Sequence, residues 1–248
     1  MLKLVEIYIS FFEFAIHGKM MREKLKRYQS YFIGEVIDVG AGDQPYRKLF
    51  TSVSKYIATN TKIHYKNNLD EVDQFTDVWI EDASALPFED NSMNGVLCFQ
   101  VLSVIQKPEL FFKEAKRILL PGGKLLLTTD FLYPTWSKAD KARYSIQQLN
   151  RFAQEAGLKV SKTESFGGFK SLVFSLLSRR IRSYPERIKN APTLLGKFFR
   201  TLVFFIYLAF LPVISLSGYI IYLLDKTNRN DFDFTFNLLL FAEKPLKE

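Results

Sequence analysis

The amino-acid sequence predicts an α/β fold, with a mostly parallel sheet and helices on both of its faces. Between residues 35 and 165, short runs rich in Val, Ile and Leu alternate with longer segments of helical periodicity. This alternation is typical of parallel sheets, because parallel neighbours need a long crossover connection. The first apolar run ends in a turn with two glycines, a feature of ligand-binding strand ends. At 248 residues the chain can hold one large domain with an appendage.

Six strands are expected in the first two thirds of the chain, and a seventh near its end. The six are predicted at residues 36–39, 56–59, 78–81, 93–99, 124–129 and 158–164. Near the end, Phe232, Phe234 and Phe236 alternate with polar residues at the two-residue period of a strand. The last strand is therefore expected within residues 232–243.

Helices are predicted between these strands and before them. Prolines favour the first helical turn, so helices are expected to begin at Pro45 and at Pro108, the second running to Leu120. Ser145 and Gln148 form a capping box for a helix that Gly157 closes. Apolar residues at helical spacing predict a helix over 2–16, and a basic helix follows over 19–27. The sequence thus divides into an N-terminal helical cap (1–30), a core (31–165), an insert (166–230) and a final strand with its tail (231–248).

The composition narrows the classes of partner. The formal net charge of +8 suggests an anionic partner such as anionic lipid, nucleic acid or a phosphorylated substrate. Cys98 is the single cysteine and lies in an apolar run, so we expect a buried structural thiol and no disulfide. His17 and His64 are far apart without nearby ligand partners, so no metal site is predicted. Glu6 and Glu13 interrupt the first apolar run, which argues against a secretory signal peptide.

The glycine turn by itself is a weak signal. A dinucleotide-binding turn would carry a third glycine three residues after Gly42, but Pro45 occupies that position. The nicotinamide interpretation therefore loses its main support. What remains is Asp38-x-Gly40-x-Gly42 at the end of the first strand.

Three further segments complete an ordered set of motifs. They are Asp82-Ala83-x-x-Leu86-Pro87-Phe88, then Val96-Leu97-Cys98-Phe99-Gln100-Val101-Leu102 at the end of the fourth strand, and Arg117-x-Leu119-x-Pro121-Gly122-Gly123. With the glycine turn they resemble class I S-adenosylmethionine-dependent methyltransferases, in the branch with a methyltransferase type 11-like domain. The resemblance covers residues 35–165. It implies a Rossmann-like, seven-stranded sheet whose last strand is antiparallel and lies between the fifth and sixth. An uncharged run before that strand adds an apolar helical insert to this fold.

The resemblance also implies a site for S-adenosylmethionine. Asp38 would lie near the methionine amino group, Asn60 would bond the ribose, and Asp82 with the Ala83 N–H would hold the adenine. The implied cofactor residues are Asp38, Gly40, Ala41, Gly42, Asn60, Asp82, Ala83, Leu86, Phe99 and Gln100, with Phe88 also beside the base. Tyr133, Asp140, Arg143 and Tyr144 are expected to face the acceptor. No residue is identified as a catalytic base.

Several positions depart from the family pattern. Ser103 and Val104 stand where Glu-His is frequent, and Asn60 replaces an acid. An inactive, membrane-bound binding protein on the same fold therefore remains an alternative. The segment Phe99-Gln100-Val101-Leu102 lacks the Pro-Pro-aromatic motif of enzymes that methylate base nitrogens. An RNA methyltransferase is thus a less favoured alternative, and nucleic acid is not the expected partner.

The run from residue 201 to residue 224 contains no charged side chain and follows a basic segment. A single pass through a membrane would separate the last strand from its sheet. With Pro212 near its middle, the run is instead expected to form two short helices of about 11 residues, each too short to cross. We expect a hairpin in the interface of an anionic membrane, with a packed lid or a dimer interface as the alternative. The sequence therefore predicts a cytoplasmic methyltransferase, peripheral or monotopic on the inner face of the membrane, for a small or lipid-linked acceptor.

Overall fold

The computed structural model describes residues 17–62, 73–133, 139–182, 187–188, 190–225 and 232–246. The chain divides into two compact units. The sheet unit comprises Arg22–Ser165 and Phe236–Glu248, and the helical unit comprises Met1–Met21 and Phe166–Thr235. The predicted helix over 2–16 lies outside the described residues, whereas the predicted basic helix is present over 17–25.

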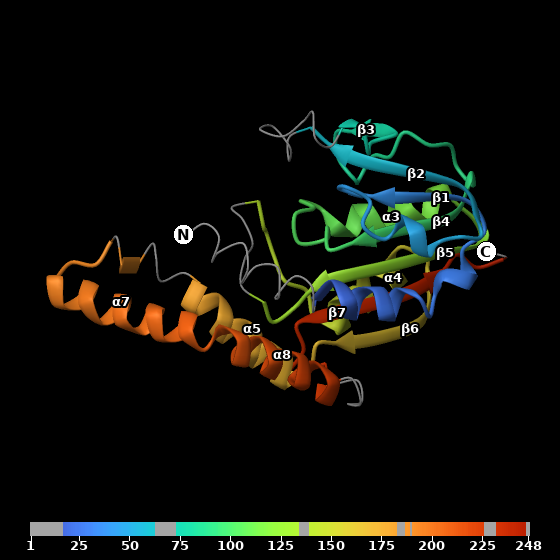
Figure 1. Cartoon of the computed structure of the whole chain (residues 1–248). Coiled ribbons are helices and arrows are strands. Elements are labelled where there is room, and N and C mark those ends of the chain that lie inside the picture. Colours follow the sequence, from blue (N-terminus) through green and yellow to red (C-terminus); the bar gives the residue numbers. More distant parts are fainter. Residues whose placement is uncertain are drawn as a thin grey trace. The chain divides into compact units, whose positions relative to one another are not determined.

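The sheet unit is built on seven strands in the order β3-β2-β1-β4-β5-β7-β6 (Figure 1). The strands are β1 (Gly34–Val39), β2 (Val53–Thr61), β3 (Val78–Ile80), β4 (Met93–Phe99), β5 (Leu119–Asp130), β6 (Lys159–Phe166) and β7 (Asn237–Glu243). Strands β1 to β5 pair in parallel, while β7 runs antiparallel to β5. The predicted fold class is confirmed, including the place of the last strand between β5 and β6.

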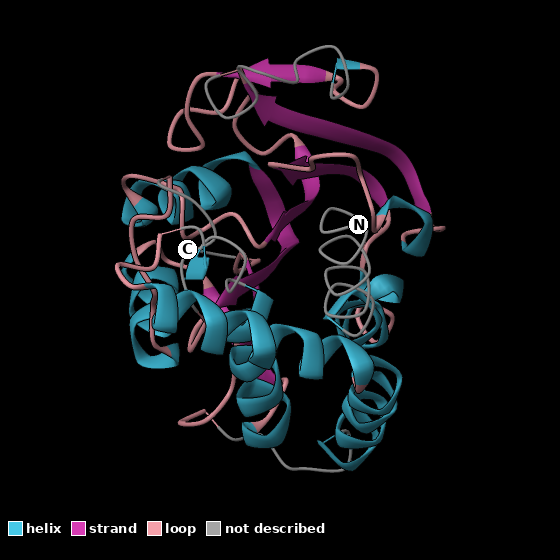
Figure 2. Ribbon diagram, turned by 60° about the vertical axis from the view of Figure 1, so that its left-hand side comes forward, coloured by secondary structure: helices cyan, strands magenta, loops and turns pink. Residues whose placement is uncertain are grey.

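Helices lie on both sides of the strands (Figure 2). The helical elements are the short 3-10 turns η1 (Gln29–Tyr31) and η2 (Arg47–Leu49) and the helices α3 (Pro108–Ile118) and α4 (Ile146–Glu155). Phe112 of α3 packs on Phe152 of α4, with 5.9 Å between the ring centres. The Ser145 hydroxyl caps α4 by accepting from the Gln148 N–H, and Gly157 ends the segment at a φ of 80°. The Ser145 half of the predicted capping box is therefore confirmed.

The core lies at the central strands β4, β5 and β7. Leu97, Leu126 and Leu240 are fully buried, as are Phe111 and Phe112 of α3. Strands covered on both faces carry continuous apolar runs rather than an alternating pattern. Cys98 is free and buried within β4, as predicted.

Three local predictions are wrong. Pro45 begins no α-helix, because Gln44 adopts a φ of 56° and only residues 45–52 separate the turn from β2, which leaves room for η2 alone. The Pro121-Gly122-Gly123 triplet lies inside β5 rather than ending a helix, since the Gly122 N–H bonds Lys244 O at 2.8 Å. The alternating segment before residue 237 forms bends, and β7 begins at Asn237.

The helical unit contains α5 (Phe169–Arg182), α7 (Leu194–Ala209) and α8 (Leu211–Asp225). The Ser171 N–H donates to the Asp225 carboxylate at 2.6 Å. A Cβ on Gly218 would lie 2.5 Å from Cζ of Phe174. The two contacts place the start of α5 at the end of α8, so these helices pack antiparallel and closely.

The apolar run forms two helices, as predicted, with the break at Phe210 just before Pro212. The predicted helix length is wrong, because α7 has 16 residues and α8 has 15. The first helix starts before the uncharged run, at Leu194. Among the described residues, none of the helices combines the length and the hydropathy that crossing a membrane requires.

Candidate cofactor site

The predicted cofactor residues follow the ends of neighbouring strands. Asp38 and the glycine turn end β1, Asn60 is near the end of β2, Asp82 follows β3, and Gln100 follows β4. Since β1 to β4 are parallel, these ends share one edge of the sheet. Ligands of open α/β sheets bind at this edge.

Asp38 is a buried carboxyl group with an unsatisfied oxygen. Its side chain is 3% exposed, and one carboxyl oxygen accepts the hydroxyl of Tyr56. The other oxygen, Oδ1, is buried and accepts no hydrogen bond from the described residues. Burial raises the pKa of Asp38 to about 7, although the Tyr56 hydroxyl opposes this shift. Such a group is suited to receive an ammonium, because a cation would satisfy Oδ1 and stabilise the carboxylate.

The glycine turn is held by hydrogen bonds within the protein. The N–H groups of Gly40 and Ala41 both donate to Thr59 O, at 2.9 and 3.0 Å. Gly40 has a φ of 72°, and a Cβ there would lie 2.6 Å from Cγ2 of Val101. Glycine is therefore required at this position for both backbone conformation and space.

Asn60 lies beneath this turn and is fully buried. Its oxygen accepts from the Gly42 N–H at 2.9 Å, and its amide nitrogen donates to Gly42 O at 3.3 Å and to Thr76 Oγ1 at 2.8 Å. Both amide hydrogens are thus used within the protein. The structure places Asn60 as a brace of the turn, and its predicted bond to ribose stays a prediction.

Aromatic rings gather where β4 ends. The ring of Phe99 is stacked on Phe50 at 6.1 Å and meets the edge of Tyr46 at 5.5 Å. Gln100, at a φ of 60°, donates to Thr128 Oγ1 at 3.2 Å and to Asn237 Oδ1 at 3.0 Å. The side chain of Gln100 therefore ties the end of β4 to β5 and β7.

The segment after β3 is fixed by its own turn and by α3. Asp82 accepts from the Ser84 N–H at 2.7 Å, and Ala83 is buried. The Leu86 N–H donates to Glu114 at 2.7 Å, and Leu86 O accepts from Arg117 at 3.0 Å. Leu86 is itself 4% exposed. These bonds set the shape of the loop that would lie along the adenine.

Three of the predicted acceptor-facing residues lie together. Arg143 pairs with Asp140 at 3.0 Å and donates to Tyr133 O at 3.2 Å. Ser103, a position that departs from the family pattern, donates to Asp140 at 3.3 Å. Tyr144 instead packs edge-on against Phe152 of α4 at 5.7 Å, and burial raises its pKa. The cluster of Ser103, Asp140 and Arg143 thus links the loop after β4 to the loop before α4.

Sequence reasoning missed Tyr56, Val101 and Phe50. Tyr56 lies two residues before Ala58, the register partner of Asp38, so the hydroxyl and the carboxyl share one face of the sheet. Strand register was the signal that could have found it, but the sequence alone does not give the register. Val101 was identified only as part of the segment after the fourth strand, and Phe50 belongs to no motif, so only their packing shows their place.

Comparisons with known proteins agree with this geometry. Residues 37–127 match the model of a family described as a methyltransferase domain. A putative sarcosine dimethylglycine methyltransferase from Galdieria sulphuraria is similar in structure, with a TM-score of 0.56 and 16% identity over 94% of this chain and 85% of that one. A putative methyltransferase from Bacillus halodurans C-125 has a TM-score of 0.54 and 18% identity, over 90% and 98% of the two chains. A SAM-dependent methyltransferase from Archaeoglobus fulgidus has a TM-score of 0.55 and 14% identity, over 92% and 94%.

The search of curated proteins found no significant match. The matched residues 37–127 nevertheless resemble a methyltransferase domain, and the strand order is that of the class I methyltransferase fold, as the motifs predict. The cofactor of such a domain is S-adenosylmethionine. The buried Oδ1 of Asp38 and the close packing at Gly40 fit the methionine end of this cofactor, which carries an ammonium.

Proposed function

We propose that this protein transfers a methyl group from S-adenosylmethionine to a small or lipid-linked acceptor at an anionic membrane surface. The observation that carries the cofactor assignment is the buried, unsatisfied Oδ1 of Asp38 beside the glycine turn. A buried acceptor without a donor is costly, and the methionine ammonium would supply the missing partner. The family match to residues 37–127 supports the same assignment.

Each part of the site has a proposed role. Asp38 binds the methionine ammonium, and the turn at Gly40, Ala41 and Gly42, braced by Asn60, shapes the wall beside it. Asp82, Ala83 and Leu86 hold the adenine, while Phe99 and Gln100 line the end that carries the sulfonium. When bound, the cofactor supplies an electrophilic methyl group.

Acceptor positioning is assigned to the loops after β4 and β5. The cluster of Ser103, Asp140 and Arg143, with Tyr133 bonded to it, would orient the acceptor. Alignment of a nucleophile with the methyl group supplies much of the acceleration of such transfers. We therefore assign positioning, and no general base, to this cluster.

The apolar surface of α7 and α8 supports attachment to the inner face of a membrane. Large side chains are strongly exposed along both helices, including Leu195 at 65%, Phe198 at 62% and Val213 at 63%. Lys197 and Arg180 add exposed positive charge in the same unit. Contiguous exposed apolar residues next to basic ones are typical of surfaces that bind anionic lipid.

A second candidate is a binding protein on this fold that performs no chemistry. The turn favours it in one respect, because the N–H groups of Gly40, Ala41 and Gly42 all donate within the protein and leave none for a ligand. Such a protein would bind membranes without binding S-adenosylmethionine.

Calorimetric titration with S-adenosylmethionine and S-adenosylhomocysteine tests the cofactor assignment. We expect saturable binding that Asp38→Asn weakens by about tenfold or more, because the charge-assisted bond is lost. Gly40→Val should abolish binding, since its Cβ meets Val101 at 2.6 Å. Gly157→Val is the matched control: its φ of 80° gives similar backbone strain, but only Lys116 lies near, at 3.7 Å. No binding at millimolar ligand would favour the second candidate.

Flotation with liposomes tests the membrane assignment separately. The protein should float with phosphatidylglycerol liposomes at low salt, and Phe198→Ser combined with Phe205→Ser should reduce the floating fraction. Both side chains are exposed on α7, at 62% and 51%. Leu110→Ser, which removes an apolar side chain 36% exposed on α3, is the control and should change nothing. Failure of the unaltered protein to float, or dimers held by α7 in sedimentation equilibrium, would contradict the assignment.

A further inference from the structure

Arg47 lies beside the candidate cofactor site and belongs to none of its motifs. It is an exposed residue at the start of η2, in the short segment that joins the glycine turn to β2. Its guanidinium carbon lies 5.3 Å from the centre of the Tyr56 ring, a cation–π contact. Its Nη1 donates to Gln44 Oε1 at 2.9 Å. The guanidinium is therefore held at two points, one on β2 and one next to the glycine turn.

The Tyr56 ring connects this cation to the buried carboxyl group of Asp38. The face of the ring carries Arg47, and its hydroxyl donates to Asp38 Oδ2. Burial and the charge of Asp38 raise the pKa of the hydroxyl, whereas the charge of Arg47 lowers it. A cation and an anion thus lie within electrostatic reach of the same phenol group.

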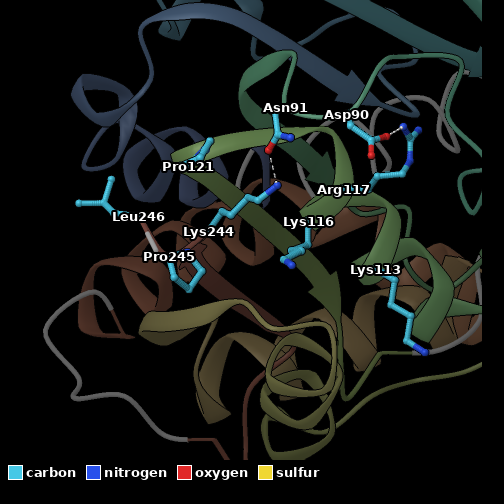
Figure 3. Close-up of a pocket in the computed structure, with 9 residues that line it drawn as sticks. All are labelled: Asp90, Asn91, Lys113, Lys116, Arg117, Pro121, Lys244, Pro245 and Leu246. Carbon is cyan, nitrogen blue, oxygen red and sulfur yellow. Dashed lines mark hydrogen bonds and ion pairs between the residues drawn. The ribbon is translucent and has the colours of Figure 1, made fainter. Parts of the chain in front are cut away.

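Arg47 differs in its partners from Arg117 and Arg143 of the same unit. Arg117 pairs with Asp90 at 2.6 Å, as the dashed line in Figure 3 shows. Arg143 pairs with Asp140 at 3.0 Å. Within the part of the chain that the structure describes, no carboxylate forms an ion pair with Arg47, and the oxygen that its side chain bonds is neutral. An anion from outside the protein can therefore approach this guanidinium without breaking an ion pair.

The N–H groups of the glycine turn are already used within the protein. Those of Gly40 and Ala41 donate to Thr59 O, and that of Gly42 donates to Asn60. The N-terminus of a helix would also attract an anion, but the segment after the turn forms only the three residues of η2. An anionic group at this place therefore depends on a side-chain cation.

We infer that Arg47 binds the carboxylate of the methionine part of S-adenosylmethionine while Asp38 binds its ammonium. The two charged groups of an amino acid share one carbon atom and lie about 3 Å apart. With a hydrogen bond at each end, they can bridge an anion and a cation roughly 8 Å apart, which suits two groups held around one phenol ring. A guanidinium matches a carboxylate with two parallel hydrogen bonds, and stacking on Tyr56 orients it before the ligand arrives.

This role of Arg47 rests on the proposed cofactor site and adds a basis for its selectivity. Decarboxylated S-adenosylmethionine keeps the ammonium and the sulfonium and lacks only the carboxylate. Asp38 would act on both ligands, whereas Arg47 would act on S-adenosylmethionine alone. The two side chains can therefore be separated by comparing the two ligands.

Calorimetric titration of the full chain with each ligand tests the inference. Arg47→Gln should weaken the binding of S-adenosylmethionine about tenfold, because a charge-assisted bond is lost, and should change the binding of the decarboxylated ligand by less than about twofold. Arg47→Lys should restore only part of the loss, since an ammonium cannot make the two parallel bonds. Asp38→Asn should weaken both ligands.

The matched control is Arg151→Gln. Arg151 is also an exposed arginine beside an aromatic ring, with its guanidinium carbon 5.7 Å from the centre of Phe152, but it lies on α4. It should leave both affinities unchanged. Equal weakening of the two ligands by Arg47→Gln, or no weakening of S-adenosylmethionine, would overturn the role of Arg47 alone. If the unaltered protein binds neither ligand, the proposed function fails together with it.

Discussion

The two units of the chain differ in how far they bury large apolar side chains. In the sheet unit, Phe111 and Leu126 are fully buried between the layers of the fold. In the helical unit, Phe198 and Leu195 are 62% and 65% exposed. Leu126 of β5 and the pair in α7 both lie in apolar stretches, so hydropathy alone does not distinguish them. The difference lies in what surrounds each stretch.

A parallel sheet needs two covering layers, and α3 and α4 help to provide them through an apolar stripe on one face. Helix α7 carries apolar residues around most of its circumference, and Phe204 is the one large side chain of α7 that is buried within the described residues. A helix that is apolar all round needs a partner on several sides. The comparison supports the proposal that the partner of α7 is lipid.

The largest difference in the free energy of unfolding is expected between the variants Phe111→Ala and Phe198→Ala. Removing the buried ring should lower the free energy of unfolding by about 3–5 kcal/mol, because a cavity remains. Removing the exposed ring should change it by less than about 0.5 kcal/mol. Chemical denaturation followed by circular dichroism measures both values. A similar loss in the two variants would show that α7 is covered by protein and would break the comparison.

Glu164→Gln, also in the sheet unit, should cause the next largest loss in the free energy of unfolding. Glu164 is 3% exposed, and it accepts from Lys24 at 2.5 Å and from the Tyr28 hydroxyl at 2.7 Å. Burial opposes ionisation, but these bonds and one from Lys162 hold the pKa of Glu164 at about 2. The amide cannot neutralise Lys24, so we expect a loss of about 3 kcal/mol in unfolding free energy.

The pH dependence of unfolding checks the same assignment. Because the pKa of Glu164 is depressed in the fold, its contribution is present above pH 4.5 and is lost as the pH falls toward 2. The difference between the protein and Glu164→Gln should therefore shrink below about pH 4. A constant difference down to pH 2 would contradict a role for the charge. Glu155→Gln, an exposed partner of Arg151 at 3.7 Å, is a suitable control.

The fold could be predicted because its signals are local and ordered. Two motifs mark the ends of β1 and β3, and short apolar runs between helical segments indicate most of the remaining strands. The errors arose where tertiary bonding replaced local preference. The Pro121-Gly122-Gly123 triplet favours the end of a helix. In the fold, however, the Gly122 N–H donates to Lys244 O just after β7.

The site was only partly predictable for the same reason. Asp38, the glycine turn and Gln100 were found from motifs, and they meet at one edge as expected. The bond from Tyr56 to Asp38 depends on register, and the cluster of Ser103 and Asp140 depends on two loops that meet only in the fold.

Gly218→Ala tests the packing inside the helical unit, where α5 and α8 bury side chains against each other. The added Cβ would lie 2.5 Å from Cζ of Phe174, so α5 and α8 must separate or the ring must turn. Overpacking of this kind costs about 1–3 kcal/mol. Hydrogen exchange should accelerate in α5 and α8 and stay unchanged in β4 and β5. Gly196→Ala, whose Cβ would meet the Thr193 hydroxyl at 3.0 Å, serves as a milder control.

The smallest expected effect is the pH dependence of cofactor binding at Asp38. The ligand-free fold favours the protonated carboxyl, because its pKa of about 7 lies above the ordinary 3.8. The stability that this group contributes is therefore full below about pH 4 and is lost as the pH rises to about 7. Binding of an ammonium has the opposite preference, since it requires the carboxylate.

The affinity for S-adenosylhomocysteine should therefore fall as the pH drops below about 7, by up to tenfold per pH unit. Calorimetry at several pH values should also show proton release on binding near neutral pH. Asp38→Asn should bind more weakly and with an affinity that does not vary over the same range. Tyr56→Phe removes the one hydrogen bond that the described residues donate to the Asp38 carboxyl. It should move the midpoint of the dependence to higher pH, because that bond lowers the pKa of Asp38. If the affinity of the unaltered protein does not vary with pH, Asp38 does not bind the ammonium. The burial of this carboxyl group in the sheet unit would then have another cause.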